Sequence, residues 1–282
     1  MREITGKTAL YCILADPIGH VQTPQLVNRL MREQDRDGVM VPVHVRPDDL
    51  PQMMAALRRA GNLRGMVVTV PHKMAALPLC DALEGDAAQI GAVNVVRREA
   101  GGRLVGGMLD GQGFVRGLRA LGFVPAGASV YLAGAGGAAS AIAFALARAG
   151  IGSLSIANRG QARYQALAER LARHHPALPV RAAGADASGH ALVINATSLG
   201  MSPGDPPPLA LESLDAGQWV ADIIMEPAQT ALLAQARRIG ARTYGGLGML
   251  QAQVADMVAF FDAGQPAQAG AHHAGPTERS MG

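Results

Sequence analysis

The chain has 282 residues, of which 49% are hydrophobic and 17% are charged. This composition provides enough apolar side chain for two packed domains, and it excludes disorder of the whole chain. Its net charge is only +3, its arginines are scattered and 4% of its residues are aromatic, so the sequence predicts no nucleic-acid partner. The first residues, MREITGKTALYCILADP, lack the apolar core of a signal peptide and no stretch of 18 apolar residues follows, so we expect a cytoplasmic protein without a membrane partner.

The first part of the chain alternates short strand patterns with helical ones. Apolar runs rich in β-branched residues predict strands, and the amphipathic runs between them predict helices. Strands are expected over 8–16, 39–45 and 65–70, and helices over 24–34 and 50–61. Strands separated by helices are typical of βαβ units, so this part is expected to form one α/β half with a parallel sheet.

A second α/β unit begins near Gly111 and continues to residue 240. Its expected elements are a helix over 111–122, a strand over 129–134, a helix over 138–150, a strand over 153–159, a helix over 162–175, strands over 191–197 and 218–224, and a helix over 230–240. A glycine-rich break at 244–248 precedes a last helix over 249–261, which is expected to pack back on the first half.

These patterns predict an α/β protein with two domains. An N-terminal α/β substrate domain is expected to comprise 1–110 and 249–282, and a doubly wound, Rossmann-type domain is expected to comprise 111–248. The tail from Asp262 onward is rich in Ala, Gly, Pro and Gln without a hydrophobic period, so we expect it to be a loose extension. His272 and His273 lack a third ligand, and Cys12 and Cys80 lack metal-ligand spacing, so no metal site and no disulfide scaffold are predicted.

The stretch VYLAGAGGAASAIA carries the clearest chemical motif. Gly134, Gly136 and Ala139 form a G-x-G-x-x-A pattern that directly follows an apolar strand and opens a helix. The first glycine permits the turn, the second lets a pyrophosphate approach the backbone, and the helix N-terminus supplies free N–H groups. We therefore expect a dinucleotide to contact Gly134, Gly136, Gly137 and Ala138, the alternative being a tight turn without a ligand.

The strand that follows this motif indicates which dinucleotide is bound. A site for NAD usually offers a carboxylate to the ribose 2′-hydroxyl about 20 residues after the glycines. This chain instead has Asn158, Arg159 and, one helical turn later, Arg163. Guanidinium groups bind a phosphate and a carboxylate repels one, so the sequence predicts NADP with Arg159 as the main contact. The alternative is that these arginines are ordinary surface residues.

Two charged residues lie where the predicted halves meet. Lys73 follows the apolar strand and proline of GMVVTVPHK, and Asp110 lies in the glycine-rich stretch GGMLDGQGF. A lysine and an aspartate at the seam could exchange a proton with an alcohol while a hydride moves to or from a nicotinamide ring. Each residue taken alone could also be a solvated charge. His20 and His72 are further acid–base candidates, and a structural role is the simpler interpretation for each.

The ordered motifs along nearly the whole chain resemble those of the shikimate dehydrogenase family. The matching stretches are DPIGHVQTPQLVN, VTVPHK, IGAVNVV, LDGQGF, GAGGAASA, NRGQAR, INATSLGM and GGLGMLQAQ. The resemblance implies a two-domain protein whose last helix returns to the first domain. It also implies NADP-dependent interconversion of a cyclic alcohol and its ketone, with a place in aromatic amino acid biosynthesis.

The resemblance also implies roles for single residues. Lys73 would be the proton donor and acceptor and Asp110 its partner, while the substrate hydroxyls would bind Thr69, Asn94 and Gln253. The cofactor channel would be lined by Thr197 and Ser198, with Gly246 and Met249 at its nicotinamide end.

Several positions depart from the family's pattern, and most of the changes run from polar to apolar. The two serines of the first motif are Val21 and Thr23, and an asparagine on the lysine strand is Val67. A tyrosine that helps to hold the substrate carboxylate in the family is Met225. Three more such positions are Val95, Met108 and Leu109. The chemistry end is therefore kept and the carboxylate end is apolar, so we expect shikimate to be a poor substrate and a less acidic ring polyol to be preferred.

Two other functions stay open on the sequence alone. One is a folate-type methylene dehydrogenase with a similar plan and a lysine in its cleft, although NATSLGM and GLGML disfavour it. The other is a non-catalytic NADP-binding regulator, which would not need Lys73, Asn94, Asp110 and Gln253 together. We expect a monomer or a homodimer that binds a small-molecule substrate.

Overall fold

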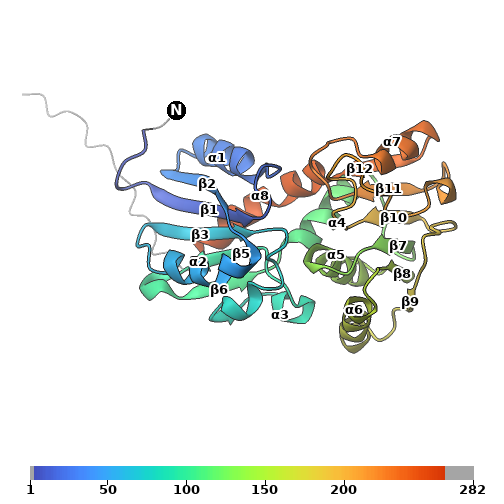
Figure 1. Cartoon of the computed structure of the whole chain (residues 1–282), viewed down its shortest axis with the longest axis horizontal. Helices are drawn as coiled ribbons and strands as arrows, with labels where there is room; N and C mark the ends of the chain where they lie inside the picture. Colours follow the sequence, from blue (N-terminus) through green and yellow to red (C-terminus); the bar gives the residue numbers. More distant parts are fainter. Residues whose placement is uncertain (1–2, 264–282) are drawn as a thin grey trace, which may run out of the picture.

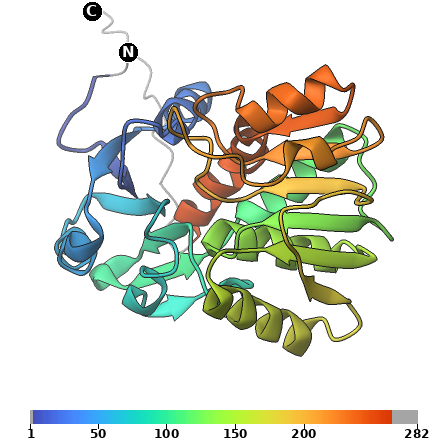
Figure 2. The ribbon, with the colours of Figure 1, turned by 45° about the vertical axis from the view of Figure 1, so that its right-hand side comes forward.

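The computed structural model describes residues 3–263 and contains two sheets of six strands each. The sheets lie side by side, each with its own helices, and α8 and α4 lie between the two lobes (Figures 1 and 2). The extension predicted after Asp262, with His272 and His273, lies outside the described residues apart from its first two positions. No helix within 3–263 combines the length and the apolar character needed to cross a membrane.

The first sheet has the strand order β2-β1-β3-β5-β6-β4. Its strands are β1 (Ala9–Ala15), β2 (Gly38–His44), β3 (Leu63–Val68), β4 (Ala82–Leu83), β5 (Val95–Arg98) and β6 (Leu104–Gly107). The first three are parallel, as expected, and β5 runs antiparallel to both β3 and β6. Pro42 is tolerated in β2 because this edge strand pairs with β1 alone.

The sequence analysis missed β4, β5 and β6. These strands have two to four residues each, too few for a clear alternation of apolar and polar positions. Arg97, in the middle of β5, is nevertheless buried, because Glu84 and Glu99 bind its guanidinium group and Phe260 packs under it at 5.1 Å. Glu99 is close in sequence, but Glu84 and Phe260 come from other parts of the chain, so the local pattern could not indicate them.

The helices of the first lobe cover its sheet and connect its strands. They are α1 (Thr23–Glu33), α2 (Leu50–Leu57) and α3 (Ala87–Ile90), with short 3-10 turns at Pro47–Asp49, Leu77–Leu79 and Ala100–Gly102. A proline in the first turn of α1 and another in the first turn of α2 suit positions where no backbone N–H is needed within the helix.

The second sheet is parallel throughout, with the strand order β12-β11-β10-β7-β8-β9. Its strands are β7 (Ser129–Ala133), β8 (Ser153–Ala157), β9 (Val180–Ala182), β10 (Leu192–Asn195), β11 (Trp219–Asp222) and β12 (Arg242–Gly245). Its helices are α5 (Gly137–Arg148), α6 (Gln161–His174) and α7 (Ala231–Arg238), with a 3-10 turn at Leu211–Ser213. The short strands β9 and β12 were not expected. The order is that of a doubly wound dinucleotide-binding sheet, as predicted.

Helix α8 (Gly246–Asp262) begins three residues earlier than expected. The predicted glycine-rich break is instead the end of β12 and the first turn of this helix. Its glycines permit close contacts, since a Cβ on Gly246 would lie 2.2 Å from the carbonyl oxygen of Ile223. The helix packs on α1, β3 and β5, as well as on α4 (Asp110–Ala120), so it returns to the first lobe as predicted. The domain boundaries proposed at 110/111 and 248/249 stay a prediction.

We expect the contact between α8 and β3 to contribute measurably to stability. Gly65 faces the buried ring of Phe261, and a Cβ at this position would lie 2.2 Å from that ring. Gly65→Ala should therefore lower the free energy of unfolding by about 1–3 kcal/mol. The melting temperature should fall by about 2–4 °C for each kcal/mol of stability lost, and thermal unfolding measures this shift. Gly61→Ala is the control, because a Cβ there meets nothing within 4 Å. Equal stability of the two variants would contradict the close contact between Gly65 and Phe261.

Candidate active site

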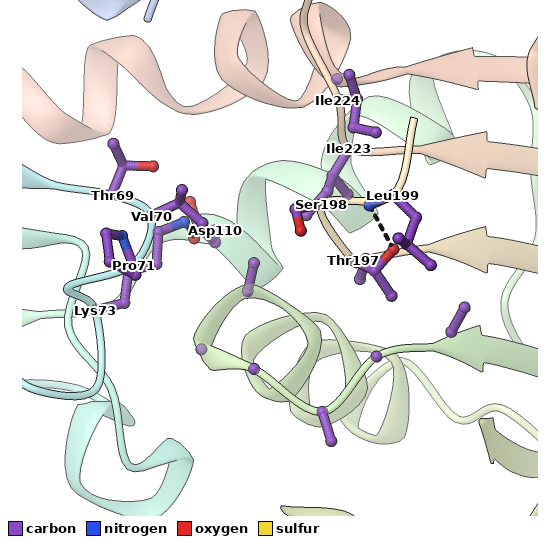
Figure 3. A pocket seen from close by; sticks show the side chains of 18 of the residues that line it. Thr69, Val70, Pro71, Lys73, Asp110, Thr197, Ser198, Leu199, Ile223 and Ile224 are labelled. Carbon is purple, nitrogen blue, oxygen red and sulfur yellow. Dashed lines mark hydrogen bonds and ion pairs between the residues drawn. The ribbon is translucent and has the colours of Figure 1, made fainter. Parts of the chain in front are cut away.

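A cavity of about 950 Å³ lies between the two sheets. It is lined by the loop after β3 and the start of α4 on one side, and by the loops after β7, β8, β10 and β11 on the other. Figure 3 shows Thr69, Lys73 and Asp110 facing Thr197 and Ser198 across this space. Every site residue expected from the sequence lines the cavity except Val21.

Val21 does not line the cavity, and its place in the substrate site stays a prediction. Its side chain is 6% exposed and lies in the apolar cluster that includes Ile13, Val27 and Met257. A valine gains free energy by packing there, whereas a hydroxyl would lose it without a hydrogen-bond partner. Thr23, two residues further on, does line the cavity and keeps a hydroxyl at this end.

The loop that carries Lys73 is held by hydrogen bonds to its surroundings. The Thr69 N–H donates to the carbonyl of Leu14 at 3.0 Å, and the Lys73 carbonyl accepts from the Val93 N–H at 2.9 Å. The buried ring of His72 donates from Nε2 to the carbonyl of Val45 at 2.8 Å. Burial lowers the pKa of His72 below its ordinary value. His72 is therefore a neutral residue that anchors the loop, and the lysine follows it into the cavity.

Asp110 is the acceptor around which the polar groups of the site gather. The Lys73 ammonium forms an ion pair with Oδ2, and the side chains of the two residues are 15% and 5% exposed. Asn94 donates to Oδ1 at 2.8 Å and Gln253 donates to the same oxygen at 3.2 Å. The carboxylate lies at the first residue of α4, where the helix dipole favours negative charge.

Asn94 is held in one orientation by both ends of its amide. Its Oδ1 accepts from the Leu109 N–H at 2.8 Å, and its Nδ2 also reaches Gln253 Oε1 at 3.2 Å. Gln253 projects from α8 beside Gly113, where a Cβ would lie 2.8 Å from the glutamine Cβ. The close approach of α4 and α8 thus brings the glutamine to the aspartate, and four of the expected residues meet at one point.

The part of the cavity near the first lobe carries little positive charge. Thr23, Thr69 and His20 supply its polar groups in addition to the Lys73 network, and Val67 and Met225 are among its apolar residues. Burial lowers the pKa of His20, an effect that the charge of Glu226 partly offsets, so the imidazole is neutral near pH 7. Lys73 is therefore the one cation on this side of the cavity among the described residues, and it is already paired.

The turn between β7 and α5 has the geometry that the glycine motif predicts. Gly134 has φ +112°, and a Cβ there would lie 2.8 Å from the carbonyl oxygen of Ala196, so a side chain is excluded. A Cβ on Gly136 would meet nothing within 4 Å, which leaves space for a ligand close to the backbone. Gly137 begins α5 and abuts Lys73 across the seam. A pyrophosphate fits here against the free N–H groups of the helix N-terminus.

The loop after β8 fits a phosphate on the ribose. Asn158, Arg159 and Arg163 line the cavity, and Asn158 stabilises the turn by donating to the carbonyl of Gly160 at 2.8 Å. Within residues 3–263 neither arginine has a hydrogen bond or an ion pair to another side chain, so both are available to a ligand. Asp110 is the one carboxylate among the described residues that lines the cavity, and it lies at the opposite end. The residues present therefore fit NADP.

Three residues that the sequence analysis did not single out hold the loops after β10 and β11. Asn195 Oδ1 accepts from the Thr197 hydroxyl at 2.7 Å, and its Nδ2 donates to Asp222 at 3.1 Å. Asp222 in turn accepts from the Thr230 hydroxyl at 2.7 Å. Thr197 then accepts from the Leu199 N–H, the bond drawn in Figure 3. A buried aspartate at the end of an apolar strand was the available signal for this network.

The chain matches two family models at the positions of the two lobes. The shikimate dehydrogenase substrate binding domain matches residues 13–96, and the shikimate/quinate 5-dehydrogenase model matches residues 121–200. A shikimate dehydrogenase (NADP⁺) from Geobacter metallireducens is 40% identical over 259 residues, which are 89% of this chain and 90% of that protein. The chain belongs to the shikimate dehydrogenase family. It is an NADP-dependent oxidoreductase, which confirms the predicted enzyme class and cofactor.

Solved structures of the family share the fold. A shikimate dehydrogenase in complex with NADP⁺ has a TM-score of 0.83 and 31% identity, covering 93% of this chain and 92% of its own. A ligand-free 5-ketofructose reductase from a Gluconobacter strain has a TM-score of 0.78 and 32% identity, covering 91% of this chain and 94% of its own. The two-domain Rossmann-type fold predicted from the sequence is thereby confirmed.

We expect Arg159 to contribute to the choice of NADP over NAD. Hydrogen bonds to charged groups contribute about 1.5–3 kcal/mol, so Arg159→Ala should weaken NADP⁺ binding by about 10- to 150-fold. NAD⁺ binding should change little, because NAD⁺ lacks the 2′-phosphate. Calorimetric titration with both cofactors measures the two effects. Arg173→Ala is the control, since Arg173 lies on α6, is exposed and is outside the cavity, and an equal loss of both cofactors in Arg159→Ala would refute the assignment.

Proposed function

We propose that this member of the shikimate dehydrogenase family interconverts a carboxylate-free ring polyol and its ketone. The observation that carries the proposal is the contrast between the two ends of its substrate site. The end near Asp110 has a complete set of hydrogen-bonding groups for a hydroxyl. The other end has Val21 and Met225 at two positions where the family has hydrogen-bond donors for a carboxylate, and neither side chain can donate.

The proposed chemistry at the polar end is proton transfer by Lys73. NADP supplies the hydride acceptor or donor when it is bound. In the oxidation direction, the substrate hydroxyl gives its proton to the neutral amine Nζ of Lys73, and in the reduction direction the ammonium returns it to the carbonyl oxygen. Asp110 orients Nζ and stabilises its charged form. Asn94 and Gln253 hold the aspartate and can bind the neighbouring hydroxyl of the substrate.

The proposed substrate class follows from what the other end lacks. Val21 lies in the core and Met225 presents a thioether, so neither donates a hydrogen bond to an acid group. Losing two hydrogen bonds to a carboxylate costs about 3–6 kcal/mol, a factor of roughly 10² to 10⁴ in binding. Thr23 and Thr69 still offer hydroxyls, which suit a neutral polyol. 5-Ketofructose, named for one structural neighbour, is a polyhydroxy ketone without a carboxylate and belongs to this class.

Membership of the family sets aside the folate-type dehydrogenase that the sequence alone left open. The non-catalytic regulator is disfavoured by the intact network around Asp110. The cytoplasmic location and the state of monomer or homodimer stay predictions.

Lys73→Ala tests the proton transfer. General acid–base catalysis contributes about 10²- to 10⁴-fold, so kcat should fall by that factor while the Kd for NADP⁺ changes less than about threefold. Stopped-flow kinetics and fluorescence titration of the cofactor give the two quantities. Near-normal turnover by the variant would remove Lys73 from the mechanism.

A substrate panel tests the substrate class. Initial rates at 340 nm with shikimate, quinate and the cyclohexane-1,2-diols in oxidation, and with 5-ketofructose in reduction, give kcat/KM for each compound. We expect at least one carboxylate-free compound to exceed shikimate by about 10²-fold or more. A shikimate rate that exceeds every neutral compound would show that the substrate is the family's usual acid.

A further inference from the structure

Two polar residues near the apolar end of the substrate site have no part in the proton transfer. His20 lies in the loop between β1 and α1 and lines the cavity. Glu226 follows β11 in the second lobe and is exposed directly beside the cavity-lining Met225. The Glu226 carboxylate is close enough for its charge to act on the His20 ring. His20 thus lines the cavity from the first lobe, and Glu226 follows the cavity-lining Met225 in the second lobe.

The imidazole of His20 has an unsatisfied nitrogen. Its Nδ1 is buried and has no hydrogen-bond partner of normal geometry among residues 3–263, and the Pro17 carbonyl near the ring acts to raise its pKa. The other histidine near this loop, His72, differs in that its Nε2 donates to the Val45 carbonyl and its ring does not line the cavity. A buried polar atom without a partner costs free energy, so a ligand that supplies the partner is favoured.

We propose that His20 is a specificity-determining residue that hydrogen-bonds a substrate hydroxyl remote from Lys73, while Glu226 disfavours substrates with a carboxylate at the same place. This inference rests on the proposed function and names the groups that select the neutral substrate. A hydroxyl both donates and accepts, so it satisfies either tautomer of a neutral imidazole. A carboxylate only accepts, and it would lie beside a charge of its own sign.

Removal of the Glu226 charge tests the electrostatic half of the proposal. Glu226→Gln should raise kcat/KM for shikimate by about 5- to 50-fold at low salt and leave that for 5-ketofructose within twofold. The gain should shrink at 1 M salt, because ions screen exposed charges. Glu212→Gln is the control, because it removes the same charge from an exposed residue away from the cavity. It should leave kcat/KM for shikimate unchanged. A shikimate rate unchanged by Glu226→Gln would overturn the selective role of this residue.

Replacement of the imidazole tests the hydrogen bond. His20→Phe should raise KM about tenfold for the fastest neutral compound of the panel, with kcat within threefold and the Kd for NADP⁺ unchanged. His20→Asn keeps a donor and an acceptor and should restore most of the lost affinity. A KM that is equal in wild type and His20→Phe would make His20 a structural residue. These comparisons are made relative to wild type, so they hold whether wild type prefers shikimate or the neutral compound.

Discussion

The buried carboxylate of Asp110 is the constraint on which the rest of the site depends. A carboxylate that is 5% exposed is costly unless its oxygens are paired. Here one oxygen pairs with the Lys73 ammonium and the other accepts from Asn94 and Gln253. The donors come from the loop after β3, the segment before β5 and helix α8, so the charge can be accommodated only when all three elements are in place.

Close backbone contacts deliver these elements to one point. Gly111 lies against the carbonyl of Ala141 in α5, and Gly113 lies against Gln253 in α8. Gly137, at the start of α5, lies against the side chain of Lys73. Because glycine lacks a Cβ, the start of α4 can approach both lobes at once, and the cofactor turn lies directly beside the lysine. The position of Lys73 is therefore coupled to the geometry of the glycine turn.

The substrate cavity divides into a part that resembles the family and a part that does not. The glycine turn lies within the residues that match the shikimate/quinate 5-dehydrogenase model, and the polar network around Asp110 consists of residues that the sequence resemblance implies. The opposite end combines threonine hydroxyls with apolar side chains, and a neutral histidine and a glutamate lie beside it. Under the proposed function, catalytic chemistry and substrate selection would be carried by separate residues, so that one can change while the other is kept.

The sequence by itself determined the parts that depend on local spacing. The strand, glycine turn and helix around Gly134, and the arginine after the next strand, are close in sequence, so their geometry follows from the chain itself. The sequence also indicated Lys73 and Asp110, since each ends or begins a recognisable element.

The tertiary structure alone decided what depends on distant contacts. It showed that Val21 is a core residue, that Arg97 is buried in a short strand by Glu84 and Phe260, and that the charge of Glu226 acts on the His20 ring. Burial and charge pairing between segments far apart in the chain leave no periodic signal, so only the folded molecule reveals them.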